Sequence, residues 1–114
     1  MKRHWKRYEK IPNTGMDRID NLQIMKSYGY AMSGATAKAK EILGIAMSED
    51  PLASPYRIAQ VYVALGDYNE ALNQLDNAYN NRNLHMFWIK VDPSFDAVRN
   101  EQRFKNLLKK MNLN

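Results

Sequence analysis

Apolar residues recur every three or four positions from about residue 20 onward, which is the spacing of one face of an α-helix. The first run consists of Leu22, Met25, Tyr28 or Gly29, and Met32. The second run consists of Ala35, Ala39, Ile42, Leu43, Ala46 and Met47. Asp20 is a plausible helix N-cap, and Gly34 separates the two runs. The pattern therefore predicts a helical hairpin over residues 20–48.

A second helical hairpin is predicted over residues 54–81. Ser54 followed by Pro55 is a typical helix start, and Gly66 ends the run that follows. Asp67 and Glu70 have the spacing of a capping box. The apolar faces of the two helices consist of Ile58, Ala59, Tyr62 and Leu65, and then of Ala71, Leu72, Leu75, Ala78 and Tyr79.

An arm and a capping region flank the two hairpins. The breaker "IPNTG" leads us to expect a basic arm and turn over residues 1–15 and a helical domain over 16–114. "LHMFWIKV", which starts at residue 84, is too short for its periodicity to separate strand from helix. We interpret it as a turn or short helix packed over the second hairpin. Helical spacing then resumes, which predicts a cap over 84–112, with the apolar residues Phe95, Val98, Phe104, Leu107, Leu108 and Met111.

The two hairpins match each other at a distance of 32 positions. The matched pairs are Tyr30 and Tyr62, Gly34 and Gly66, Ala39 and Ala71, Leu43 and Leu75, and Ala46 and Ala78. Alanine lets two antiparallel helices approach closely, glycine turns the chain, and the inward tyrosine and leucine fill the space above the crossing. Because each hairpin leaves an apolar face for its neighbour, the pattern predicts two units of a repeat.

This pattern resembles the tetratricopeptide repeat. The first unit offers Ser27, Tyr30, Gly34, Ala39, Leu43, Ala46 and Pro51, and the second offers Ala59, Tyr62, Gly66, Ala71, Leu75 and Ala78. The period departs from the usual length of about 34 residues, Lys26 stands where leucine is common, and Asn83 stands where the second proline is expected. The stretch "FWIKVDPSFDAVRNEQRF" is similar to the ending of many bacterial tetratricopeptide proteins. The resemblance implies an all-α fold, namely a short α-α superhelix of helical hairpins with a C-terminal capping helix.

For function, the resemblance implies a protein–protein interaction module. In that family the first helix of each repeat lines a concave groove, which would hold a peptide or helix of another protein. The implied partner-binding residues are Asn21, Ile24, Tyr28, Ala31, Tyr56, Gln60 and Val63, on faces that also carry Met32, Ala53 and Ala64. The remaining aromatic residues of the helical domain are predicted to be core, including Tyr68, Tyr79, Phe87 and Trp88.

Charge and the ends of the repeat leave two alternatives open. The net charge is +5, and both ends of the chain are basic while the middle is not. Basic ends allow nucleic-acid binding through the arm and "RFKNLLKK", but no base-reading motif accompanies them. The apolar end at Leu22 and Met25 has only the arm with Trp5 to cover it, so a second copy of the chain could close it as a homo-oligomer.

The sequence predicts no enzyme, no cofactor and no metal site. It contains no cysteine and only two histidines, His4 and His85, and its serines lack a nucleophile motif. We expect His85 to be partly buried and structural. No apolar run of roughly 18 residues and no signal peptide occur, so we expect a cytoplasmic protein without membrane contact.

Overall fold

The computed structural model describes residues 19–112, with side chains described from Leu22 onward. No described residue lies in a strand, so the all-α class predicted from the sequence is confirmed. The predicted arm at residues 1–15 lies outside the described residues. The elements are α2 (Ile19–Met32), α3 (Thr36–Glu49), α4 (Pro55–Leu65), α5 (Tyr68–Asn80), the 3-10 segments η1 (Leu84–Trp88) and η2 (Pro93–Val98), and α6 (Gln102–Lys110).

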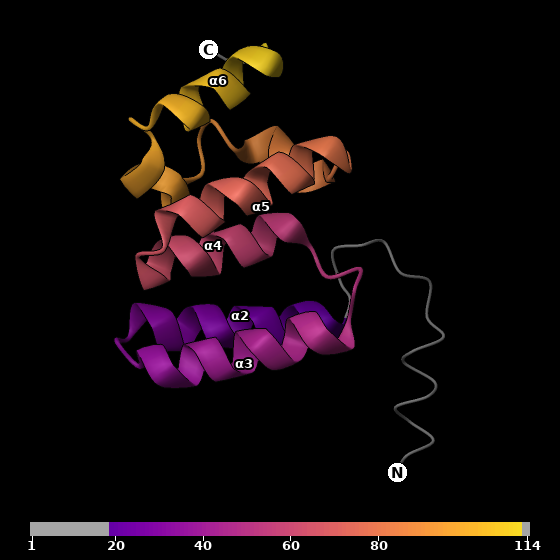
Figure 1. Ribbon diagram of the computed structural model, residues 1–114, viewed down its shortest axis with the longest axis vertical. Helices are drawn as coiled ribbons and strands as arrows, with labels where there is room; N and C mark the ends of the chain where they lie inside the picture. Colours follow the sequence, from indigo (N-terminus) through magenta and orange to yellow (C-terminus); the bar gives the residue numbers. More distant parts are fainter. Residues whose placement is uncertain (1–18, 113–114) are drawn as a thin grey trace.

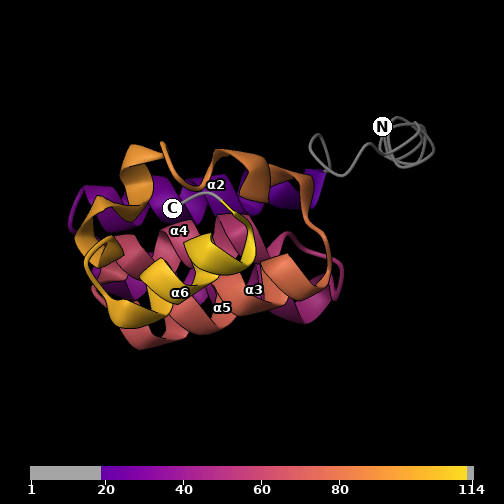
Figure 2. The same ribbon diagram turned by 90° about the horizontal axis from the view of Figure 1, so that it is seen from above.

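The helices stack as hairpins along the long axis of the molecule (Figure 1). α2 packs against α3 and α4 packs against α5, while α4 also contacts α2 and η2. α6 packs on α5 at the far end of the stack. Seen along the stack, α2 and the 3-10 segments lie on one side and α3, α5 and α6 on the other (Figure 2). The architecture is a short α-α superhelix of helical hairpins with a C-terminal helix at its end.

Gly34 and Gly66 turn the chain after α2 and α4 with the same backbone geometry. Their φ angles are +91° and +83°, in the left-handed region that glycine enters without a Cβ clash. In both turns the amide after the glycine donates to a carbonyl of the last helical turn, from Ala35 to Tyr30 at 2.8 Å and from Asp67 to Tyr62 at 2.9 Å. This is the Schellman pattern, and it confirms both predicted glycine turns.

Two of the three predicted helix caps are confirmed. The Ser54 hydroxyl accepts a hydrogen bond from the Arg57 amide at 3.3 Å, and the Asp67 carboxylate accepts one from the Glu70 amide at 3.3 Å. The cap predicted at Asp20 is wrong, because α2 already includes Ile19. An acidic residue is favoured both at the N-cap and in the first helical turn, so the sequence pattern does not separate the two positions.

Small side chains sit where the helices of each hairpin cross. Ala39, Ala59 and Ala71 are completely buried. The Ser27 hydroxyl, also completely buried, donates to the Ala39 carbonyl at 2.6 Å and so joins α2 to α3. Above these crossings the core forms two clusters, one between the hairpins and one under the C-terminal segment, and Tyr62 packs against both.

Tyr30 departs from the prediction that it points inward. Tyr62 is partly buried with its hydroxyl 3.9 Å from the sulfur of Met47 in the preceding hairpin, whereas Tyr30 is 38% exposed. The difference follows from position in the stack, because within the described residues nothing precedes α2. The side of α4 that faces the first hairpin is apolar, whereas the matching positions of α2 are exposed Lys26, Gly29 and Ser33.

The C-terminal region consists of two 3-10 segments and a final helix. η1 confirms the short helix predicted over "LHMFWIKV", and α6 confirms the final helix. Pro93 begins η2 and interrupts the region where a first helix of a third hairpin would lie. α6 buries Phe104 and Leu107 and exposes its polar face to solvent.

Replacing Gly66 with alanine should lower the free energy of unfolding by about 1–2 kcal/mol. No atom lies within 4 Å of the added Cβ, so the cost arises from the left-handed backbone alone. Gly44→Ala is the matched control, since its Cβ also meets nothing within 4 Å and Gly44 lies inside α3. That variant should raise the free energy of unfolding by about 0.5–1 kcal/mol. Urea unfolding measures both, and a change of the same sign in the two variants would contradict this account.

Candidate interaction surface

The residues predicted to line a concave groove are mostly buried. Ile24, Ala31, Tyr56, Gln60 and Val63 are all buried in the described part of the chain. Tyr28 is half-buried, and the side chain of Asn21 lies outside the described residues. Their exposure differs from the prediction because these positions face the next element of the stack and not the open side of the helix.

On α2, the predicted groove positions pack against the second hairpin. Ile24 belongs to the cluster that contains Ile58 and Val61 of α4, and Tyr28 packs against that cluster. A partner could contact Ile24 only by separating the two hairpins. These two side chains therefore hold the hairpins together.

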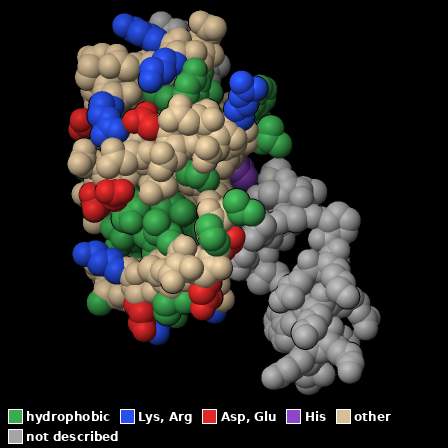
Figure 3. Space-filling view, turned by 45° about the vertical axis from the view of Figure 1, so that its right-hand side comes forward, with side chains coloured by type: hydrophobic (Ala, Val, Ile, Leu, Met, Phe, Trp, Pro, Cys, Tyr) green, Lys and Arg blue, Asp and Glu red, His purple; other side chains and the backbone are tan. Residues whose placement is uncertain are grey.

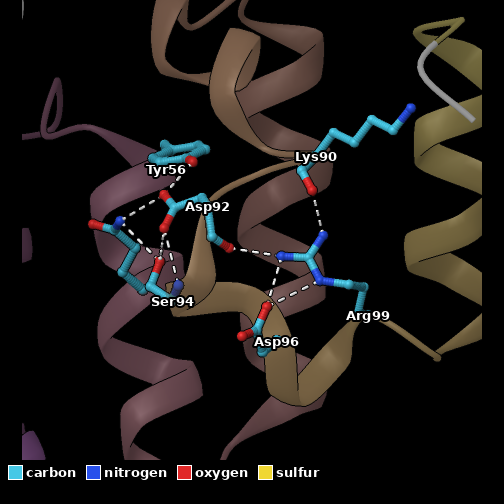
Figure 4. A network of polar contacts seen from close by, with 7 residues as sticks. Tyr56, Lys90, Asp92, Ser94, Asp96 and Arg99 are labelled. Carbon is cyan, nitrogen blue, oxygen red and sulfur yellow. Dashed lines mark hydrogen bonds and ion pairs between the residues drawn. The ribbon is translucent and has the colours of Figure 1, made fainter.

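On α4, Tyr56 and Gln60 bind the chain's own segment before and within η2. Figure 4 shows Tyr56 next to Asp92 and Ser94. The Tyr56 hydroxyl donates to the Asp92 carboxylate at 2.5 Å, and the Gln60 amide donates to the same carboxylate at 3.1 Å. The Gln60 amide also lies 3.0 Å from the Ser94 hydroxyl, and Ser94 in turn donates to Asp92 through both its amide and its hydroxyl. The face predicted to receive a partner is thus occupied by residues 92–94.

Arg99 fixes the backbone of the short link between η1 and η2. Its guanidinium donates to the carbonyl of Lys90 at 2.6 Å and to the carbonyl of Asp92 at 2.7 Å. The same guanidinium forms an ion pair with Asp96 at 2.9 Å. Figure 4 shows the Lys90 side chain extending away from this network, so only its carbonyl takes part. The segment that links η1 to η2 is therefore held by side chains from two directions.

His85 of η1 connects the start of α4 to the end of α5. Its ring stacks on the Tyr56 ring at 5.5 Å between centroids, and its Nε2 lies 3.4 Å from the Arg57 guanidinium. Asn83, immediately after α5, donates to the Ser54 hydroxyl at 3.0 Å and accepts from the His85 amide. The predicted burial of His85 is confirmed, since only 7% of its surface is exposed.

The pKa values of this cluster follow from burial and hydrogen bonding. Burial acts to raise the pKa of Asp92, but hydrogen bonds from Tyr56, Ser94 and Gln60 outweigh it, and the pKa lies below its usual range. Burial and the bond to Asp92 raise the pKa of Tyr56. Burial and the Arg57 charge lower the pKa of His85. At neutral pH the cluster therefore holds an ionised Asp92, a protonated Tyr56 and an uncharged His85.

Four large apolar side chains around η1 are exposed to solvent. Leu84 is 73% exposed, Phe87 76%, Trp88 57% and Val91 69%. We call these four residues the η1 ridge. Phe87 and Trp88 contact each other edge to face at 5.6 Å between ring centroids. The prediction that Phe87 and Trp88 are core is wrong, because Met86 and Ile89 take the buried positions of this segment. It is also wrong for Tyr68, the first residue of α5, which is 40% exposed.

A signal for the ridge was present in the sequence. "LHMFWIKV" contains more large apolar residues than one side of a short helix can bury. Met86 and Ile89 lie three positions apart and pack into the core, so the side chains between and beside them must face outward. Aromatic density alone indicates core, whereas the spacing of Met86 and Ile89 indicates that the opposite side of the segment is exposed.

A second apolar feature is a cleft of about 450 Å³ between the two hairpins. Figure 3 shows hydrophobic side chains gathered in a hollow on this side of the stack, with charged side chains at its edges. The cleft is open to solvent between α3 and the turn that joins α4 to α5. Its lining consists of Lys40, Leu43, Gly44, Met47, Tyr62, Leu65, Gly66 and Asp67.

Comparison with known proteins gives no family, since no family model, no curated protein and no solved structure matches the chain. Across residues 19–112, no group of three or more His, Cys, Asp or Glu side chains is placed to hold a metal ion. In the same range no helix is long and apolar enough to cross a membrane. The candidate site is the η1 ridge, together with the hydrogen-bond network around Asp92 that follows it in the chain.

Replacing Asp92 with asparagine should lower the free energy of unfolding at neutral pH by about 1–3 kcal/mol. The amide cannot accept every hydrogen bond that the carboxylate receives from α4 and Ser94. Asp96→Asn is the matched control because the Asp96 side chain is 69% exposed. Its effect should stay within about 0.5 kcal/mol. Urea unfolding measures both changes, and equal losses for the two variants would contradict the assignment.

The acid limb of stability should also depend on Asp92. A carboxylate whose pKa is lowered by folding stabilises the protein above its unfolded pKa, roughly 4, and this contribution is lost as the pH falls through the folded pKa. The wild type should therefore lose stability more steeply than Asp92→Asn below about pH 4. Urea unfolding at a series of pH values tests this, and parallel acid profiles would show that Asp92 is not responsible.

Proposed function

We propose that this chain is a protein-interaction module of the tetratricopeptide-repeat type and that it contacts its partner through the η1 ridge. The observation that carries the proposal is the exposure of four large apolar side chains, each more than half exposed, between Leu84 and Val91. Contiguous apolar patches on soluble proteins commonly mark interaction sites. Aromatic residues such as Phe87 and Trp88 supply a large contact area with few rotatable bonds.

The segment that carries the ridge is held in place by contacts with the rest of the fold. Met86 and Ile89 anchor the segment in the core, Asn83 and His85 tie its start to α4, and the Arg99 guanidinium holds the Lys90 carbonyl at its end. A surface that is ordered before binding loses little conformational freedom when a partner arrives. This arrangement supports a preformed contact surface.

The match between the two hairpins supports a module of the tetratricopeptide-repeat type. The two hairpins match at a distance of 32 positions. Their first helices end in the same turn, at Gly34 and Gly66, and their crossings bury Ala39 and Ala71. Binding in a concave groove lacks support, since Tyr56 and Gln60 are engaged by residues 92–94. The absence of cysteine fits the reducing cytoplasm, where we place the module.

A partner of different sequence is favoured over a second copy stacked on α2. Leu22 and Met25 are exposed there, but the outer positions of α2 that match the buried face of α4 are Lys26, Gly29 and Ser33. Continuation of the stack would bury the Lys26 ammonium without a described partner charge, which is unfavourable. On the ridge, Phe87 and Trp88 are exposed and contact each other directly.

A photo-reactive benzoylphenylalanine in place of Phe87 tests the proposal in cells that express the full chain. The proposal predicts a discrete adduct with another protein, because this side chain is 76% exposed on the ridge. The same residue in place of Ile45, which is 50% exposed on α3, is the control and should give no such adduct. The adduct at position 87 should also disappear when Trp88 is replaced with alanine.

Two outcomes would contradict the proposal. An adduct at position 87 with twice the mass of the 13.3 kDa chain would favour self-association. The same adducts at positions 87 and 45 would show that contact is non-specific. Circular dichroism should show unchanged helix content in both substituted proteins, because exposed substitutions change stability by only about 0.5 kcal/mol.

A further inference from the structure

The segment that carries the η1 ridge is basic. Between Asp76 and Asp92 the chain contains Arg82 and Lys90 and no acidic residue. The two acidic residues that bound this stretch are both engaged, since Asp76 pairs with Arg103 at 2.7 Å and Asp92 accepts from α4. The ridge is therefore flanked by positive charge from its own segment.

Arg82 adopts a backbone conformation that is unfavourable for arginine. Its φ angle is +56°, in the left-handed region. It occupies the same place at the end of α5 that glycine occupies in the earlier turns, because the amide of the next residue, Asn83, donates to the Ala78 carbonyl at 2.9 Å. Glycine would remove the strain. A strained residue of this kind points to a use for its side chain, and the Arg82 side chain is exposed two positions before Leu84.

Lys90 lies at the other end of the ridge, between Trp88 and Val91. Its backbone is fixed because the Arg99 guanidinium donates to its carbonyl at 2.6 Å. Its side chain is exposed and extends away from the Asp92 network (Figure 4). Arg82 and Lys90 thus place one cation before and one cation after the four apolar side chains.

We infer that the η1 ridge takes a linear segment of a partner protein that is both apolar and acidic. This inference rests on the proposed function. The apolar side chains of the segment pack on Leu84, Phe87, Trp88 and Val91, and its carboxylates pair with the two flanking cations. Charge complementarity of this kind sets orientation and specificity more than affinity.

A single-stranded nucleic acid is the alternative to an acidic peptide, because its bases could stack on aromatic side chains and its phosphates are negatively charged. The ridge fits it less well, because Leu84 and Val91 are aliphatic and the stretch between Asp76 and Asp92 contains only two cationic side chains, Arg82 and Lys90. A backbone of regularly spaced phosphates needs a longer track of basic residues. Nucleic acid is therefore an outcome for the test to exclude.

Selection from a display library of random 12-residue peptides on the immobilised full chain tests the inference. Enriched peptides should carry both apolar residues and a net negative charge relative to the starting library. They should not bind the double variant Phe87→Ala, Trp88→Ala. Enrichment of neutral or basic peptides, or no enrichment over the double variant, would overturn the inference.

Two charge variants separate the inference from general attraction by the basic arm at residues 1–10. Arg82→Gly and Lys90→Gln leave that arm intact, and each should weaken binding of a selected peptide by about 2- to 5-fold at low salt. Arg82→Gly should at the same time raise the melting temperature, because it relieves the left-handed strain. A variant that is more stable and yet binds less tightly excludes partial unfolding as the cause.

The remaining outcomes distinguish the inference from the proposed function. If selected peptides bind Arg82→Gly and Lys90→Gln as tightly as the wild type but fail to bind the Phe87, Trp88 double variant, the inference is wrong and the ridge remains a contact surface. If the double variant binds as well as the wild type, both are wrong. Tighter binding of an oligothymidine probe than of any selected peptide, measured by fluorescence anisotropy, would overturn the inference in favour of nucleic acid.

Discussion

The structure depends on the carboxylate of Asp92, which attaches the C-terminal segment to α4. Tyr56 and Gln60 reach this carboxylate from one helix, and Ser94 reaches it from the following turn. A partly buried charge is tolerated only when its hydrogen bonds replace those it made with water. Because the bonds come from a neighbouring helix, the cost of burying the charge is offset only while η2 stays docked on α4.

Docking of this segment determines which surfaces remain free. The docked segment places the Phe95 ring edge to face with the Tyr56 ring, at 5.1 Å between centroids. Phe104 of α6 belongs to the same core cluster as these two rings. In η1 and the residue that follows it, Met86 and Ile89 are buried while Phe87 and Trp88 are exposed. The exposed ridge and the segment that fills the predicted groove face of α4 are thus neighbours in one stretch of the chain, residues 84–94.

Local signals predicted the helices, and long-range contacts explain the errors. The start at Ser54 and the turn at Gly66 depend on residues within one helical turn, so the sequence was sufficient for both. The roles of Tyr56 and Gln60 depend on Asp92, which is 36 and 32 positions away, and periodicity carries no information about such a pair. The exposure of Tyr30 likewise reflects its place in the stack, since its match Tyr62 has the same local sequence pattern but a hairpin in front of it.

A double-mutant cycle between Tyr56→Phe and Asp92→Asn, measured by urea unfolding at neutral pH, tests the central claim most directly. If the phenol and the carboxylate hold the segment on α4, the two losses should be non-additive by about 1–2 kcal/mol. A cycle that pairs Tyr56→Phe with the exposed Asp96→Asn should be additive within about 0.5 kcal/mol. Additivity in both cycles would contradict the account, because it would mean that Tyr56 and Asp92 stabilise the fold independently.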